Sequence, residues 1–159
     1  MNKTLIQTLI IDRLQLDLVI AKDALRASHE AATHAESKAE NKYDTRGLEA
    51  AYLADGQRRR LHEIEEALNS YRNLTVRSQV DEPIWIGALI LLEQSGGAGR
   101  WLLLGPDAAG LRINANDIDI LVISPRSPLG QALLGRCEGD EVEVLVDGRR
   151  QLYEIAAVH

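Results

Sequence analysis

The chain has 159 residues and a formal net charge of −6, a length that suits one ordinary domain or two small ones. Residues 1–75 carry 11 Lys/Arg against 12 Asp/Glu, whereas residues 76–159 carry 7 against 12. This balance argues against direct binding to duplex DNA, which needs a basic surface, and favours a basic protein surface as the partner of the second half. The single cysteine, Cys137, excludes an internal disulfide and a thiolate metal cluster.

The first residues do not have the pattern of a signal peptide or a membrane span. Their apolar run is interrupted by Gln7 and Thr8 and stopped by Asp12. Together with the lone cysteine, this predicts a soluble protein of the reducing cytoplasm without membrane association.

Residues 5–36 contain neither Pro nor Gly and predict a long helix. Leu16, Val19 and Ile20 widen its apolar stripe near the start, so we expect this part to pack against something besides its partner helix. The stripe itself consists of Leu14, Leu18, Ala21, Leu25 and Ala32.

A polar segment at residues 36–46 predicts a turn, after which a second helix continues to about residue 73. Gly56 is a soft spot in this helix, costing about 1 kcal/mol relative to Ala. The two helices predict an antiparallel hairpin about 45 Å long. The apolar stripe of the second helix consists of Leu48, Ala51, Leu61, Ile64, Leu68 and Tyr71.

The pattern then changes to short apolar runs separated by turn residues. Strands are expected at residues 84–92, 101–104, 119–124, 141–146 and 151–158. Asp147-Gly148 predicts a hairpin turn. A short helix is expected at residues 127–134, with Ser127 as N-cap, Pro128 in the first turn and Gly135 as C-cap. We therefore predict two domains, residues 1–75 and 76–159.

The region around the short helix resembles the C-terminal domain of the Gre transcription factors, GreA and GreB. The matching residues are Ser127, Pro128, Ala132, Leu133, Gly135, Gly139, Asp140, Val142 and Val144. The resemblance spans nearly the whole chain and implies an α+β fold. In that fold an N-terminal antiparallel helical hairpin, a coiled coil, precedes a small FKBP-like β-rich domain with one short helix.

The resemblance also implies a function. Gre factors dock this domain beside the secondary channel of RNA polymerase and insert the coiled coil toward the active site, where acidic tip residues help the polymerase hold Mg²⁺ and a water so that nascent RNA is cleaved. Carboxylates suit such a role because oxygen ligands bind Mg²⁺ and a second metal activates water. The chain would then be an accessory factor, not an enzyme, with no cofactor of its own beyond Mg²⁺ shared with the polymerase.

The tip residues match the family only in part. Glu40 with Asn41 matches the Glu-Asn of the GreA tip, but the family's Asp falls on Ser37. Glu36 and Asp44 are close enough in sequence to substitute as carboxylates. The alternative is that these charges are only solvated and that the tip occludes or probes the channel without supporting cleavage.

The other candidate residues each have two interpretations. Arg58, Arg59 and Arg60 lie where related factors face RNA, but Asp55–Arg59 and Arg60–Glu63 also have the spacing of ion pairs on a helix. The partner-binding candidates Ser127, Pro128 and Leu129 could equally form only a well-capped helix.

Trp85, Trp101 and Cys137 are expected to be packing residues. Two rival functions remain: a structural adaptor that pairs through its helices, and a prolyl isomerase suggested by the FKBP-like fold alone. An intramolecular hairpin predicts a monomer, whereas the adaptor predicts association between chains.

Overall fold

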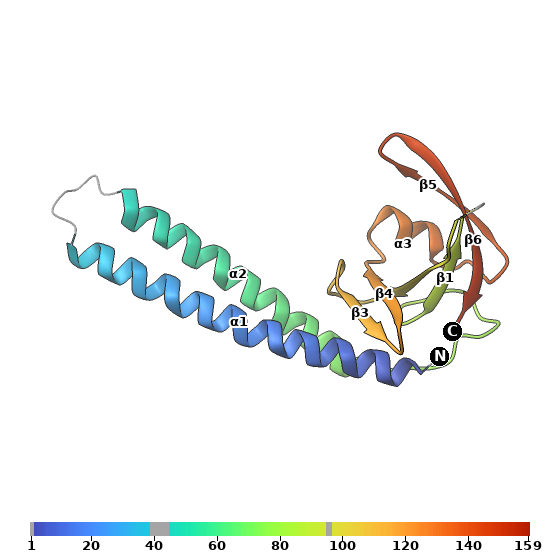
Figure 1. Cartoon of the computed structure of the whole chain (residues 1–159), viewed down its shortest axis with the longest axis horizontal. Coiled ribbons are helices and arrows are strands. Elements are labelled where there is room, and N and C mark those ends of the chain that lie inside the picture. Colours follow the sequence, from blue (N-terminus) through green and yellow to red (C-terminus); the bar gives the residue numbers. More distant parts are fainter. Residues whose placement is uncertain (1, 39–44, 95–96) are drawn as a thin grey trace. The chain divides into compact units, whose positions relative to one another are not determined.

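The computed structural model describes residues 2–38, 45–94 and 97–159, which form the expected α+β fold of two long helices followed by a sheet with one short helix (Figure 1). The chain divides into two compact units, which we call the sheet unit (Met1–Ile11 with Ser70–His159) and the helical unit (Asp12–Asn69). The predicted boundary between two domains, after residue 75, stays a prediction. The elements are α1 Lys3–Lys38, α2 Thr45–Asn73, β1 Leu89–Glu93, β2 Arg100–Leu104, β3 Arg112–Ala115, β4 Ile118–Ile123, α3 Pro128–Leu133, β5 Glu141–Val146 and β6 Arg149–Val158.

The long helices extend further toward the turn than the polar sequence suggested. Part of the predicted turn at residues 36–46 is helical, because α1 continues to Lys38 and α2 begins at Thr45. Glu, Lys and Arg are good helix formers, so a polar segment need not be a turn. None of the described helices combines the length and the apolar character that a membrane crossing requires.

The helical unit is held together by a narrow apolar seam. On α1 the seam buries Leu14 and Ala21, as expected. On α2 the prediction was wrong for Leu48, which is 57% exposed, and for Ala51, which is also exposed. The seam instead passes through the buried Ala54, because small side chains let two helices approach closely. The remaining buried apolar residues of α2 in this unit are Ile64, Ala67 and Leu68.

Six strands form one sheet in the order β3-β4-β2-β1-β6-β5. All neighbouring strands are antiparallel except β2 and β4, which are parallel. The sequence did not predict β3. The expected strand at residues 84–92 begins only at Leu89, because the backbone of Ile84 instead exchanges hydrogen bonds with Gly135 and Arg136 (2.9 and 2.7 Å).

The core of the sheet unit lies on one face of this sheet. Alternate residues of β1, β2, β5 and β6 point into it, including Ile90 and Leu92 on β1 and Val142 and Val144 on β5. Leu133 of α3 is fully buried in the same cluster, so α3 covers this face. The opposite face of β1 and β2 carries Leu89 and Leu103, which are directly paired and buried.

Tyr71 joins the end of α2 to the loop after β2, within the sheet unit. Its hydroxyl donates a hydrogen bond to the backbone oxygen of Asp107 (3.0 Å), while Gln7 donates to the backbone oxygen of Tyr71 (2.7 Å). Burial, followed by the charge of Asp107, raises the pKa of Tyr71, so the hydroxyl remains a donor. Gly105 is required beneath the ring, because a Cβ there would overlap the Tyr71 hydroxyl.

Candidate functional site

The partner-binding candidates lie in the loop between β4 and α3, residues 124–129, which we call the α3 loop. Ser127 is the N-cap of α3, as predicted: its hydroxyl accepts a hydrogen bond from the Gly130 amide (3.0 Å) and donates to the Ser124 backbone oxygen (2.7 Å). The Ser124 hydroxyl in turn accepts from the Arg126 amide (3.1 Å). These bonds satisfy the free amides at the helix start and fix the backbone of the loop.

Glycine at position 130 allows the loop to close on the helix. A Cβ at Gly130 would overlap the carbonyl oxygen of Ser124, so no other residue fits without movement of the backbone. Gly135, predicted as C-cap, lies one residue beyond the observed C-cap Leu134 and has a φ of +75°, the usual conformation of a glycine in that place.

The α3 loop separates a buried side from a side that faces solvent. Leu129 is half-buried against the core cluster, whereas Pro128 is exposed. The Ser127 hydroxyl is occupied by its two local hydrogen bonds. Pro128 is therefore free to contact a partner, as is the exposed Arg126 of the same loop, and Ser127 and Leu129 hold Pro128 in place.

Two packing predictions near this loop were wrong. Trp85 is 60% exposed, and it follows Ile84, whose backbone is bonded to the residues just after α3. Cys137 is also exposed, in a turn where its amide donates to the Asp140 carboxylate (2.9 Å). The apolar run at residues 84–92 does not show by itself that Trp85 faces outward. That direction follows from the backbone hydrogen bonds of the preceding residue, Ile84.

Trp101 is partly buried in β2. Its ring stacks on His159 with 5.8 Å between ring centroids. This agrees with the packing role predicted for it.

The three arginines of α2 are exposed and lie among carboxylates. Arg58 and Arg59 both pair with Asp55 (3.5 and 3.6 Å), and Arg60 pairs with Glu63 (3.7 Å). The ion pairs predicted from the helix spacing are therefore present. Exposed pairs of this kind hold their partners weakly, so contact with RNA or polymerase stays a prediction.

The tip candidates lie mostly outside the described residues. Glu40 and Asp44 belong to residues 39–44, and of Glu36 only the helical backbone of α1 is described. Within residues 2–38, 45–94 and 97–159, no group of three or more His, Cys, Asp or Glu side chains could hold a metal ion.

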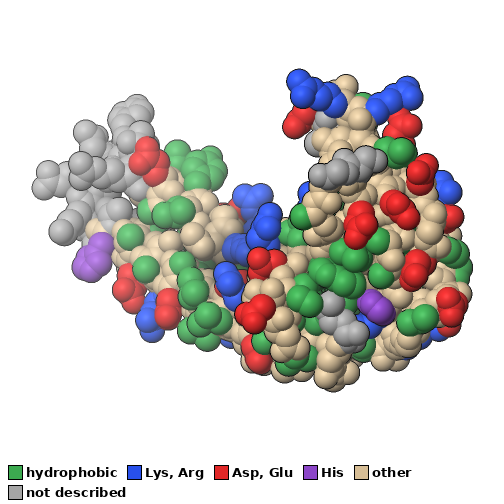
Figure 2. All heavy atoms as spheres, turned by 45° about the vertical axis from the view of Figure 1, so that its right-hand side comes forward, with side chains coloured by type: hydrophobic (Ala, Val, Ile, Leu, Met, Phe, Trp, Pro, Cys, Tyr) green, Lys and Arg blue, Asp and Glu red, His purple; other side chains and the backbone are tan. Residues whose placement is uncertain are grey.

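Acidic side chains recur across the visible face of the sheet unit (Figure 2), in agreement with the excess of Asp and Glu in residues 76–159.

Comparison with known proteins identifies the family. The family described as "Transcription elongation factor, GreA/GreB, C-term" matches residues 80–159, which include the α3 loop. The transcription elongation factor GreA of Desulfovibrio desulfuricans is 37% identical over 115 residues, 70% of this chain and 67% of that protein. GreA of Nitratidesulfovibrio vulgaris is 33% identical over 150 residues, 92% of this chain and 89% of that protein. The chain belongs to the GreA/GreB family of transcription elongation factors.

Among solved structures, the transcription factor Gfh1 is similar to 95% of this chain over 94% of its own length, with 20% sequence identity and a TM-score of 0.41.

Proposed function

We propose that the chain binds bacterial RNA polymerase through the α3 loop and places the end of its helical hairpin in the secondary channel. The observation that carries this proposal is the exposed Pro128 on a loop fixed by the Ser127 cap, inside the segment that matches the GreA/GreB family. A rigid loop loses little conformational entropy on binding, which favours its use as a docking element.

The length of α1 suits delivery of a side chain over a distance. Its 36 residues without interruption measure about 54 Å at 1.5 Å per residue. A carboxylate near its far end is thus carried about 50 Å along the helix from the first turn. This reach permits one end of the helix to act inside a channel while the other stays with a docking surface.

At the tip, Glu40 and Asp44 would supply carboxylate oxygens, with Glu36 as a further candidate. Such oxygens are the ligands that Mg²⁺ prefers. Mg²⁺ held with the polymerase centre would activate a water and stabilise the leaving oxygen, so that backtracked RNA is cleaved. The chain contributes ligands and position to this reaction, and the polymerase contributes the active site.

A second candidate function is modulation of elongation without cleavage, which Ser37 favours. This serine occupies the position of the acidic residue in the GreA tip, so the chain lacks one expected ligand. A tip with one carboxylate fewer would bind the metal more weakly and could still occlude the channel.

A pull-down with core RNA polymerase tests the docking proposal. Pro128→Glu should weaken binding about tenfold or more, because it buries a charge in the contact. Ala109→Glu, which adds the same charge at another exposed loop position, is the matched control and should bind like the wild type. Equal binding by the two variants would exclude Pro128 as a docking residue, and failure of the wild type to bind would exclude the whole proposal.

A cleavage assay separates the two functions at the tip. Stalled, backtracked complexes are incubated with the chain and Mg²⁺, and short 3′ RNA fragments are measured. Under the cleavage proposal, Glu40→Ala with Asp44→Ala abolishes these fragments and Ser37→Asp increases them. Confirmed binding without fragments from the wild type leaves the modulatory function.

Light scattering addresses the adaptor alternative. Leu16, Val19 and Ile20 are 57–58% exposed, so the described part of the chain leaves most of each of these side chains uncovered. A monomer at micromolar concentration supports an intramolecular hairpin, and a dimer supports pairing between chains.

A further inference from the structure

The outer face of β5 and β6 carries large apolar side chains that are exposed in the described structure. Strand alternation sends Val142, Val144 and Tyr153 into the core, so their neighbours point to the other side of the sheet. There Leu145 is 65% exposed and Leu152 is 48% exposed. Since α3 packs on the core face, this outer face lies on the opposite side of the sheet from α3.

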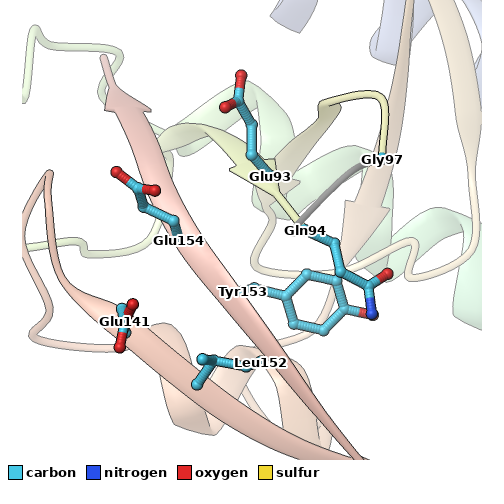
Figure 3. A pocket seen from close by; sticks show the side chains of 7 residues that line it. All are labelled: Glu93, Gln94, Gly97, Glu141, Leu152, Tyr153 and Glu154. Carbon is cyan, nitrogen blue, oxygen red and sulfur yellow. The ribbon is translucent and has the colours of Figure 1, made fainter.

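Three glutamates form a row next to Leu152 on the same outer face. Glu154 of β6 is directly opposite Glu93 of β1 on one side and Glu141 of β5 on the other. Directly paired residues of neighbouring strands point to the same face, about 5 Å apart. Figure 3 shows the three carboxylates on neighbouring strands, with the Tyr153 ring turned to the other side of β6.

The row has no basic partner in the described part of the chain. Glu143, one pair further along, is bonded to Arg150 (3.2 Å), whereas Glu93, Glu141 and Glu154 make no ion pair. Like charges directly opposite one another repel, so the three carboxylates destabilise the sheet here until cations approach them. A hollow of about 220 Å³, lined by these glutamates and Leu152 among others, leaves room for an entering side chain.

We propose that this outer face binds a protein segment that carries Lys or Arg side chains next to a large apolar side chain. The cations would meet Glu93, Glu141 and Glu154, and the apolar side chain would cover Leu152 and Leu145. Charge complementarity selects this occupant: carboxylates exclude nucleic acid and anionic lipid, and exposed leucines require more than a counterion. The inference goes beyond docking through the α3 loop, because it concerns the other face of the sheet.

Titration of the isotope-labelled chain with peptides tests the proposal. The probe is a peptide of Lys, Leu and Gly with four lysines and two leucines. One control peptide has Glu in place of Lys, and another has Ala in place of Leu. Two-dimensional NMR should place the shift changes on Glu93, Glu141, Leu152 and Glu154, with affinity falling as salt rises and falling again for the Ala peptide.

Substitutions then define the face. The triple variant Glu93→Gln, Glu141→Gln, Glu154→Gln should bind the Lys-Leu peptide about tenfold more weakly. It should still fold, because the change is isosteric and removes repulsion between the carboxylates. Glu30→Gln with Glu49→Gln and Glu65→Gln, exposed residues of the helical unit, removes the same charge and should leave the affinity unchanged.

Three results would overturn the proposal: equal loss for both triple variants, shift changes centred elsewhere on the chain, or saturation of this face by Mg²⁺ alone without response to the peptide. The assay contains no polymerase, so failure of the polymerase pull-down would not affect it.

Discussion

At two glycines of the sheet unit, a single neighbouring atom excludes any side chain, whereas the two glycines of the helical unit leave room for one. Gly105 and Gly130 each lie against another group so closely that a methyl group would overlap it, but Gly47 and Gly56 of α2 have open space around the position of a Cβ. The helical unit depends on a few buried residues and on ion pairs at its surface. A closely packed sheet unit and a pair of long helices place different demands on sequence.

The largest effect is expected for Gly130→Ala. Overlap of the new Cβ with the Ser124 carbonyl should lower the free energy of unfolding of the sheet unit by about 3 kcal/mol. Thermal unfolding followed by tryptophan fluorescence reports this, because Trp85 and Trp101 both lie in the sheet unit. Gly97→Ala, where the Cβ would make only ordinary contacts, is the control. Equal stability of the two variants would contradict the close packing of the α3 loop.

Tyr71→Phe should cost about 1.5 kcal/mol of sheet-unit stability, because the part-buried backbone oxygen of Asp107 loses its donor. The matched control is Tyr52→Phe in the helical unit, where the side chain is 69% exposed and the change should be neutral. Urea unfolding measures both variants. A neutral Tyr71→Phe would mean that the hydroxyl contributes nothing to the junction.

Gly56→Ala should stabilise the helical unit by about 1 kcal/mol, since nothing opposes the methyl group and alanine has the higher helix propensity. Helical circular dichroism at 222 nm during heating measures this change. The reverse substitution at an exposed helical site, Ala51→Gly, should destabilise by a similar amount. If Gly56→Ala lowers stability, the helix surface at this position is not open.

The stability of the sheet unit should rise with pH in the alkaline range because of Lys3. Burial, followed by the charge of Arg77, lowers the pKa of Lys3 from 10.5 to about 8, while its ammonium donates hydrogen bonds to the backbone oxygens of Arg77 and His159. The folded state therefore binds fewer protons than the unfolded state between pH 8 and 10.5, so the free energy of unfolding rises across this window. Lys3→Met should reduce that slope in chemical unfolding measured at several pH values, whereas Lys22→Met should retain it.

The smallest effect is expected for Asp55→Ala, which removes the partner of Arg58 and Arg59. Both ion pairs are exposed, so the loss should be about 0.5 kcal/mol or less. The substitution also tests the role of the arginines: stronger binding of backtracked complexes would indicate that Arg58 and Arg59, once freed, contact RNA or polymerase. A loss above 1 kcal/mol would show that the ion pairs stabilise the helix more than exposed pairs usually do.

The same difference between the units decides what the sequence could predict. The cap of α3 was predicted because its signals, Ser127 and Pro128, act within one helical turn. The strand β3 was missed because Arg112–Ala115 is short and depends on pairing with β4. The exposure of Trp85 was missed because it depends on where the distant residues 135 and 136 bind the backbone.

In the helical unit, the hydrophobic pattern predicted the helices and part of their seam, Leu14 and Ala21 on α1 and Ile64 and Leu68 on α2, but not its course near the start of α2. It selected Leu48, which is exposed, over Ala54, which is buried, because hydrophobicity alone does not show where two helices come closest. The candidate site was also predicted only in part. The α3 loop forms as expected, because its signals are local, whereas a binding partner leaves no trace in the packing of the chain.

The sheet unit is made of two separate stretches of chain, Met1–Ile11 and Ser70–His159. Topologically, the helical unit is an insertion whose two ends both belong to the sheet unit. Whole turns could therefore be added to or removed from both helices in equal number without changing a residue of the sheet unit. The length of the helices can therefore change in evolution while the sequence of the sheet unit stays the same.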